Sequence, residues 1–241
     1  MRRWRREPRR GSAATARAVR RCPRSRVVET AIGLAAEQGL AAASMRGVAD
    51  RLGVTPMALY KHIANRSQLV DEMLDRVLAD IACSSNPEVW REAVRTRIFA
   101  ARRLVVAHPW VRDAIESREV ATPRALAHMD ALMGAMFDGG LSADLVHHAM
   151  HALSTRMWGF TRDVLPTPQL PEGSEQRARA VAGFEASYPA IMRMATTSAH
   201  AAAGCDADAE FAFALDVVLS GIEHLHQSQW QPAVPVRTVL G

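Results

Sequence analysis

Apolar residues recur at helical spacing from residue 25 to about residue 230, and no segment alternates between apolar and polar positions as a half-buried strand does. The pattern therefore predicts an all-α protein. Beyond residue 85 it predicts amphipathic helices over about residues 88–107, 109–117, 123–138, 142–164, 175–198 and 207–229. The clearest loop between these helices runs from Pro166 to Gly173.

Capping residues define two helices at the start of this region. The first is expected over about residues 25–38, and Gly39 is expected to end it in the left-handed conformation that other residues resist. Ser44 can accept a backbone hydrogen bond at the start of the second, short helix, and Gly53 ends it. The buried face of the second helix is predicted to hold Val48, Ala49 and Leu52.

A third helix is expected to begin at Thr55 and Pro56. Thr55 is of a type that caps helices, and the fixed φ of Pro56 suits the first helical position. The helix is predicted to run to about His62, with Leu59 and Ile63 pointing inward because they lie one turn apart. The residues left on its outward surface are Met57, Ala58, Tyr60, Lys61 and His62.

A longer, fourth helix is expected to begin at Asn65 or Ser67 and to reach about residue 82. It would link the short helices to the rest of the chain. The residues on its apolar face are Leu69, Met73, Leu74, Val77 and Ile81.

The second and third helices, joined by a tight turn at Gly53 and Val54, have the spacing of a helix-turn-helix, whose second helix enters the DNA major groove. Backbone amides at the start of that helix suit a phosphate, and Tyr60 and Arg66 can donate to other phosphates. The candidates for base contacts are Lys61 and His62 at guanine acceptors and Met57 or Ala58 at a thymine methyl. A three-helix packing unit with no role in DNA binding is the alternative.

The segment SMRGVADRLGVTPMALYKHIANRSQLVDEML resembles the DNA-binding region of the TetR family of bacterial regulators, and the resemblance extends from Arg26 to about Leu78. The residues at the family's signature spacings are Val48, Ala49, Leu52, Gly53, Val54, Leu59, Tyr60, His62, Ile63 and Leu69. Arg66 departs from the lysine common in the family, which keeps the phosphate contact but changes its geometry. The resemblance implies that Arg46 contacts DNA, whereas the alternative is that it only solvates the helix start. The expected DNA-binding residues are Arg46, Thr55, Pro56, Met57, Ala58, Tyr60, Lys61, His62 and Arg66.

The resemblance also implies how such a protein works. A homodimer would bind a palindromic operator of double-stranded DNA, and a small-molecule inducer in a larger helical domain would move the fourth helix and release the DNA. The predicted function is thus a ligand-responsive repressor; a ligand-independent architectural protein or activator is the alternative. The family places the dimer interface on its last helices, here about 142–164 and 207–229. The apolar stripe predicted for that interface is Phe211, Leu215, Val218, Ile222 and Leu225.

Charge and composition divide the chain further. Residues 1–24 hold ten arginines and one acid, whereas the other 217 residues hold 20 basic and 24 acidic side chains. The arginine-rich segment is expected to be disordered, and a DNA-contacting arm, a solvated tail and a wrongly chosen start codon all fit it. The expected domains are 25–70 for DNA binding, 71–230 for ligand binding and dimerisation, and a tail at 231–241. No stretch fits a membrane span or a signal peptide, so a cytoplasmic, nucleoid-associated protein is expected.

Seven of the eleven methionines lie between Met129 and Met194, together with several aromatic residues. Methionine adapts its shape, so a cavity lined by these residues would suit a partly apolar inducer. Packing of an ordinary core explains the same residues. The expected ligand-binding residues are His108, Trp110, Met133, Phe137, Arg156, Trp158 and Phe160.

Other site chemistry finds little support. His147 and His151 have a spacing that can bridge a metal ion, but a polar helix face explains the pair, so neither a metal nor a cofactor is expected. Thr155 stands where tetracycline-binding members of the family have a ligand-site histidine, so tetracycline is not the expected inducer. No nucleotide-binding or nucleophile motif is present, and an enzyme is not expected. The three cysteines, expected to be ordinary thiols, are Cys22, Cys83 and Cys205.

Overall fold

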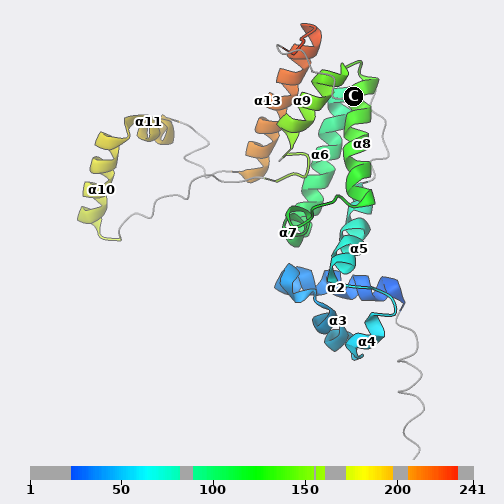
Figure 1. Ribbon diagram of the computed structural model, residues 1–241. Coiled ribbons are helices and arrows are strands. Elements are labelled where there is room, and N and C mark those ends of the chain that lie inside the picture. The colour runs from blue at the N-terminus through cyan, green and yellow to red at the C-terminus, as the bar shows by residue number, and fades with distance from the viewer. Residues whose placement is uncertain (1–22, 82–88, 155, 161–171, 198–205, 233–241) are drawn as a thin grey trace, which may run out of the picture. The chain divides into compact units, whose positions relative to one another are not determined.

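The computed structural model describes residues 23–81, 89–154, 156–160, 172–197 and 206–232 (Figure 1). All regular secondary structure within these ranges is helical, which confirms the predicted all-α class. Several sequence predictions fall on residues outside them, namely those for the arginine-rich segment before Pro23, the loop from 166 to 171, Thr155, the three cysteines and most of the predicted C-terminal tail.

The first two helices follow their capping residues. Helix α2 spans Arg24–Gln38, and the short 3₁₀ turn η1 (Leu40–Ala42) precedes helix α3 (Met45–Leu52). Gly39 has φ 83° and ψ 167°, an extended region open to glycine, rather than the predicted left-handed helical conformation. Gly53 does adopt that conformation, with φ 67° and ψ 34°. Arg24, the last residue of the predicted arginine-rich segment 1–24, already begins α2.

The third helix is shorter than predicted. Helix α4 covers only Pro56–Leu59, after which the chain tightens to three-residue spacing: the N–H of His62 donates to the carbonyl of Leu59 at 2.8 Å. Thr55 occupies the N-cap position, but its side chain makes no capping hydrogen bond, contrary to the prediction. Helix α5 (Arg66–Leu78) continues into the 3₁₀ turn η2 (Ala79–Ile81), and Asn65 caps it by accepting from the N–H of Gln68 at 2.8 Å.

Three further helices agree closely with the predicted segments. They are α6 (Trp90–Ala107), α7 (Trp110–Glu116) and α8 (Pro123–Asp138). The apolar positions of α6 repeat at helical spacing, and Val94, Ile98 and Ala101 are fully buried.

The last part of the chain departs from the predicted helices. Helix α9 is Ala143–Leu153, so the expected helix over 142–164 ends early, and Gly159 follows it with φ 76°. The segment 175–198, expected to form one helix, is divided into α10 (Ser174–Ser187) and α11 (Pro189–Thr197). The division falls at Tyr188, because a residue directly before proline avoids the helical region of φ and ψ. Helix α13 (Ala207–Gln227) matches its prediction.

Contacts between residues separate the chain into two compact units. Of the described residues, the first unit contains 23–81 and 92–135, and the second contains 89–91 and 136–232. In the first unit, α2 packs against α3 and α5 around Val27, Ala31 and Leu69, each fully buried. In the second unit, α9 packs against α13.

The apolar stripe on α13 that was predicted to form the dimer interface is largely buried inside this second unit. Phe211, Leu215 and Ile222 are 1%, 0% and 5% exposed. The most apolar face of an amphipathic helix packs against the neighbouring helices of its own chain, and α13 packs in this way against α9. The stripe is therefore a core element, and the apolar side chains that α13 turns to solvent are Phe213 and Val217.

Candidate nucleic-acid interface

The turn between α3 and α4 is built from residues that hold the backbone in place. The Ser44 hydroxyl accepts from the N–H of Gly47 at 3.0 Å and so caps α3. A Cβ on Gly47 would lie 2.6 Å from the carbonyl oxygen of Ala42, so only glycine fits there without movement. Gly53 ends α3 in the left-handed conformation, and the N–H of Val54 donates to the carbonyl of Ala49 at 3.0 Å.

Helix α4 and the turn after it bury one face in the core of the first unit and expose the other face to solvent. Leu59 and Ile63 are both fully buried, as their spacing predicted. Met57 and Tyr60 are 72% and 48% exposed, and Lys61 and His62 are exposed as well. An inward pair under an outward set of apolar, hydroxyl and cationic groups is the arrangement that a recognition helix needs.

The start of α4 offers less to a phosphate than the sequence suggested. Thr55 and Pro56 are exposed there, but the N–H of Ala58 already donates to the carbonyl of Thr55 at 2.9 Å. With four residues, α4 also sums few peptide dipoles. Side chains must therefore carry most of the phosphate contacts.

Two arginines flank this surface in different states. The side chain of Arg46, near the start of α3, is 89% exposed and lies 3.9 Å from Asp50, a distance at which an exposed ion pair is weak. Arg66, at the start of α5, donates one guanidinium N–H to the carbonyl of Leu40 at 3.2 Å, so it ties η1 to α5. Arg46 is thus the more available phosphate donor.

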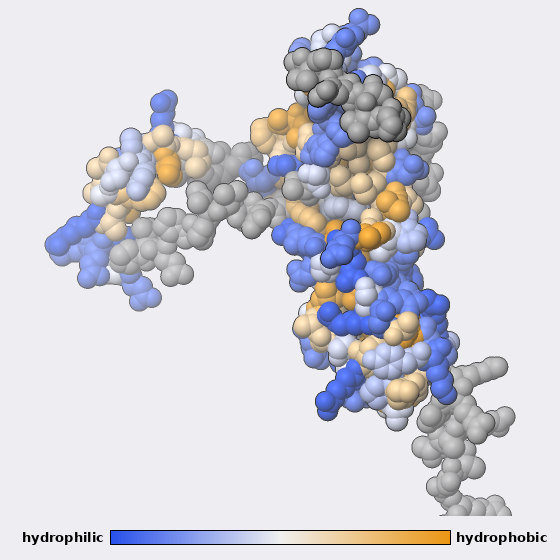
Figure 2. All heavy atoms as spheres, viewed as in Figure 1, coloured by the Kyte–Doolittle hydropathy of each residue, from blue (hydrophilic) through white to orange (hydrophobic). Residues whose placement is uncertain are grey.

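Other arginines of the first unit are held in ion pairs. Arg51 of α3 binds both carboxylate oxygens of Glu37 at 2.7 and 3.2 Å, and these hydrogen bonds and the attraction of the charges lower the pKa of Glu37. Arg24 pairs in the same way with Glu72 of α5. The view in Figure 2 shows mainly hydrophilic surface over the segment that contains α2 to α4.

A second contact set in the first unit holds α5, and sequence reasoning missed it. The guanidinium of Arg118 donates to the Ser67 carbonyl (3.3 Å), the Ser67 hydroxyl (2.8 Å) and the Asp71 carboxylate (3.0 Å). The N–H of Arg124 donates to Asp75 at 3.0 Å. We call these contacts the α5 clamp. The residues lie about fifty positions apart, so no local pattern could have predicted the pairing.

The residues predicted to bind the inducer are distributed over both units. His108, Trp110 and Met133 belong to the first unit. The members in the second are Phe137, Arg156, Trp158 and Phe160. His108 and Trp110 pack edge to face, with ring centroids 6.2 Å apart, and the buried His108 Nδ1 and Trp110 Nε1 find no hydrogen-bond partner among the described residues. Such unpaired buried nitrogens need a partner, which a ligand can supply.

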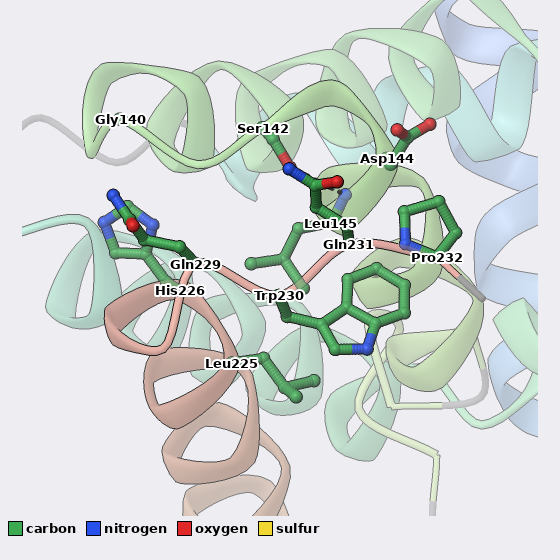
Figure 3. A pocket seen from close by; sticks show the side chains of 10 residues that line it. All are labelled: Gly140, Ser142, Asp144, Leu145, Leu225, His226, Gln229, Trp230, Gln231 and Pro232. Atoms are coloured by element: carbon green, nitrogen blue, oxygen red, sulfur yellow. Dashed lines mark hydrogen bonds between the residues drawn. The ribbon is translucent and has the colours of Figure 1, made fainter.

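A hollow of about 850 Å³ lies in the second unit, near the start of α9 and the end of α13 (Figure 3). None of the residues predicted to bind the inducer lines it. His147 and His151, whose rings are 4.6 Å apart on α9, lie outside its lining as well. Within the described part of the chain, no group of three or more potential metal ligands comes together.

Comparison with known proteins identifies the family. A model of the bacterial regulatory proteins of the tetR family matches residues 27–73, and a model of the tetracyclin repressor-like C-terminal domain matches residues 84–226. The chain belongs to the TetR family. TetR-family regulators are DNA-binding transcription factors rather than enzymes. This confirms the expectation of a DNA-binding transcriptional regulator and the expectation that the protein is not an enzyme. Among the described residues, no helix is long and apolar enough to cross a membrane.

Individual relatives of this TetR-family chain include repressors. It is 34% identical to the HTH-type transcriptional repressor DrrR1 of Streptomyces coeruleorubidus over 122 residues, which cover 48% of this chain and 44% of the relative. It is 27% identical to the class C tetracycline repressor protein of Escherichia coli over 209 residues, covering 84% and 91% of the two chains. The crystal structure of ActR from Streptomyces coelicolor in complex with actinorhodin is 25% identical, with a TM-score of 0.66 and coverage of 87% and 99%.

Proposed function

We propose that this TetR-family regulator is a repressor that binds a palindromic operator as a homodimer and leaves it when a small-molecule inducer binds. The observation that carries the proposal is the α3–turn–α4 unit, with Leu59 and Ile63 fully buried beneath an exposed reading surface formed by Met57, Tyr60, Lys61 and His62. Two relatives are named as repressors, and ActR has been crystallised with actinorhodin. The protein would then act in the cytoplasm, on the nucleoid.

The proposed roles of the DNA-binding residues follow from their exposure. Met57, Ala58, Lys61 and His62 read base edges, whereas Arg46, Tyr60, Arg66 and the Thr55–Pro56 start of α4 position the helix on phosphates. Arg66 does so while it remains bonded to Leu40.

The outward face of α13 is the proposed dimer surface. Phe213 and Val217 are 68% and 55% exposed, and with Ser220 and His224 they form one stripe along the helix. A Phe213→Glu variant should sediment as a monomer because the partner would have to bury its charge. Val120→Glu is the matched control, since Val120 is 79% exposed and lies in the other unit. Equal dimer content in both variants would refute this surface.

The α5 clamp is the proposed route from inducer to DNA. Helix α5 directly follows the recognition helix, and Arg118 fixes it through Ser67 and Asp71. An inducer shifts the equilibrium only if it binds the DNA-incompetent state more tightly, and a rearranged clamp would distinguish the two states. Arg118→Ala should lower operator affinity without altering base preference. In the control Arg124→Ala the clamp stays intact, because Arg124 contributes only its backbone N–H.

The deciding experiment is selection of operator fragments. Purified protein is incubated with sheared DNA from its source genome at near-physiological salt, and bound fragments are sequenced. A two-fold symmetric motif with half-sites about one helical turn, or a multiple of it, apart supports the proposed dimeric regulator. Strongly salt-dependent binding without any motif would instead favour the architectural alternative.

Variants sharpen this test at the level of single contacts. Lys61→Ala should change the preferred base at one or two positions, whereas Arg46→Ala should weaken binding to all sequences and reduce the salt slope by about 1. Arg103→Ala, which removes an exposed cation from α6, is the control. If the Lys61 and Arg46 variants bind like the control, the placement of α4 on DNA is wrong.

A further inference from the structure

The hollow in the second unit has a lining unlike that of a core defect. Its apolar members are Leu145, Leu225, Trp230 and Pro232, and its polar members are Ser142, Asp144, His226, Gln229 and Gln231, with Gly140 at one end. In Figure 3 the Trp230 ring lies close to Leu145, Leu225 and Pro232, Gln231 extends toward Ser142, and His226 and Gln229 lie together at the opposite end. An apolar surface with polar groups placed around it is typical of a small-molecule site.

The Trp230 ring is held in place by its neighbours. Its backbone N–H donates to the carbonyl of Leu225 at 3.0 Å, which folds the chain back over the end of α13. The His148 ring packs against the indole at 90°, with centroids 5.3 Å apart. Gln229, just before it, has φ 52°, and among the described residues it is the only one other than glycine with a positive φ. A left-handed residue at this position commonly ends a helix, and the turn that it makes brings Trp230 back over the end of α13.

The polar side chains of the lining are available to a ligand. The side chains of Asp144, His226, Gln229 and Gln231 make no hydrogen bond with the described part of the chain. Two amides and an imidazole both donate and accept, and the carboxylate accepts. None of the ten lining residues is a lysine or arginine, and the carboxylate of Asp144 would repel an anionic ligand.

We propose that this hollow is a second ligand site, separate from the inducer site, and that it binds a neutral polyhydroxylated molecule such as the sugar ring of a glycoside. Hydroxyl groups donate and accept at once, which matches the mixed lining, and the apolar face of a sugar ring can lie on Trp230. A cationic ligand would have Asp144 and the face of Trp230 as partners, but it would leave most of the donors and acceptors of Gln229 and Gln231 unmatched.

Three probes that share a phenyl group test the chemistry on the intact protein without DNA: phenyl β-D-glucoside, benzyl alcohol and benzylamine. Binding is measured by broadening of the probes' proton resonances and by tryptophan fluorescence. The glucoside should bind about tenfold more tightly than the other two, because they lack its ring hydroxyls. Equal binding of benzyl alcohol, tighter binding of benzylamine or no binding of the glucoside would each overturn the proposal.

Variants then locate the site. Trp230→Ala and Gln231→Ala should each weaken glucoside binding several-fold or more, and Trp230→Phe should retain most of it because an aromatic face remains. Gln227→Ala is the matched control, since Gln227 lies on α13 but outside the lining and bonds to Glu223 instead. Thermal unfolding of each variant separates lost binding from lost folding. Equal affinity of the Trp230→Ala and Gln227→Ala variants for the glucoside would place the glucoside elsewhere. Neither result bears on operator binding, which is a separate proposal.

Discussion

Helices α3 and α10 show how differently two helices of one chain can be stabilised. The eight residues of α3 include three buried ones, and the helix has a side-chain cap at one end and a left-handed glycine at the other. The fourteen residues of α10 include none that is buried, and the helix has no side-chain cap. Its neighbour α11 also leaves Ile191 and Met194 about half exposed. Packing rather than length decides how firmly a helix is held, because short isolated helices are marginal in water.

The largest expected effect is in the α3–α4 region. Leu59→Ala would leave a cavity under the reading surface and should lower the free energy of unfolding by about 2–5 kcal/mol, measured by urea denaturation. Met57→Ala, on the same helix but 72% exposed, should change it by less than about 0.5 kcal/mol. A similar loss in both variants would show that α4 is not anchored as described.

The second effect concerns a pair of glycines in α2 and α3. Gly47→Ala should destabilise the protein by about 1 kcal/mol or more, because its Cβ would meet the Ala42 carbonyl oxygen at 2.6 Å. Gly33→Ala should instead stabilise it by about 0.5–1 kcal/mol, since nothing lies within 4 Å of the added methyl group and alanine favours helix. Thermal denaturation gives both values, and the same sign for both would contradict the close approach.

A third prediction probes the other side of the comparison. Ile191→Ser in α11 should change the free energy of unfolding by less than about 0.5 kcal/mol, because the side chain is already 47% exposed. The measurement is urea denaturation at low protein concentration. A loss comparable with that of Leu59→Ala would mean that α11 is covered in solution and that its stability resembles that of α3 after all.

The smallest effect is electrostatic and links α2 with α3. Arg51 lowers the pKa of Glu37 below its ordinary 4.5, so the ion pair stabilises the folded state above that pH, and this contribution is lost as the pH falls through the lowered pKa. The thermal midpoint of Glu37→Gln should therefore lie slightly below that of the parent at neutral pH, and the two should converge in acid. A difference that persists unchanged to about pH 3 would exclude the pair as its source.

Local signals predicted the helix-turn-helix region from α3 to the start of α5 well. Ser44, Gly53 and Asn65 mark helix ends through their own side chains or backbone freedom, and Leu59 and Ile63 form an inward pair by spacing alone. These interactions span only a few residues, so the order of residues nearly specifies them. The exception is Thr55, which takes the cap position without making the bond.

Beyond the helix-turn-helix region, the spacing of apolar residues was a weaker guide to tertiary contacts. The stripe of Phe211, Leu215 and Ile222 was predicted to meet a second subunit, yet it is buried within the chain. Periodicity shows that a helix has an apolar face but not what covers it. For the same reason, the residues predicted to bind the inducer stay a prediction, although His108 and Trp110 retain unpaired buried nitrogens.

The sequence alone determined the all-α class, the helix-turn-helix with its outward residues and the resemblance to the TetR family. Each of these depends on periodicity, capping or motif spacing, which are properties of neighbouring residues. Only the tertiary structure decided that Arg118 holds α5 through Ser67 and Asp71, and that Trp230 joins the start of α9 in one hollow. Such contacts join residues about fifty or more positions apart, and their formation depends on how the helices pack rather than on any local preference.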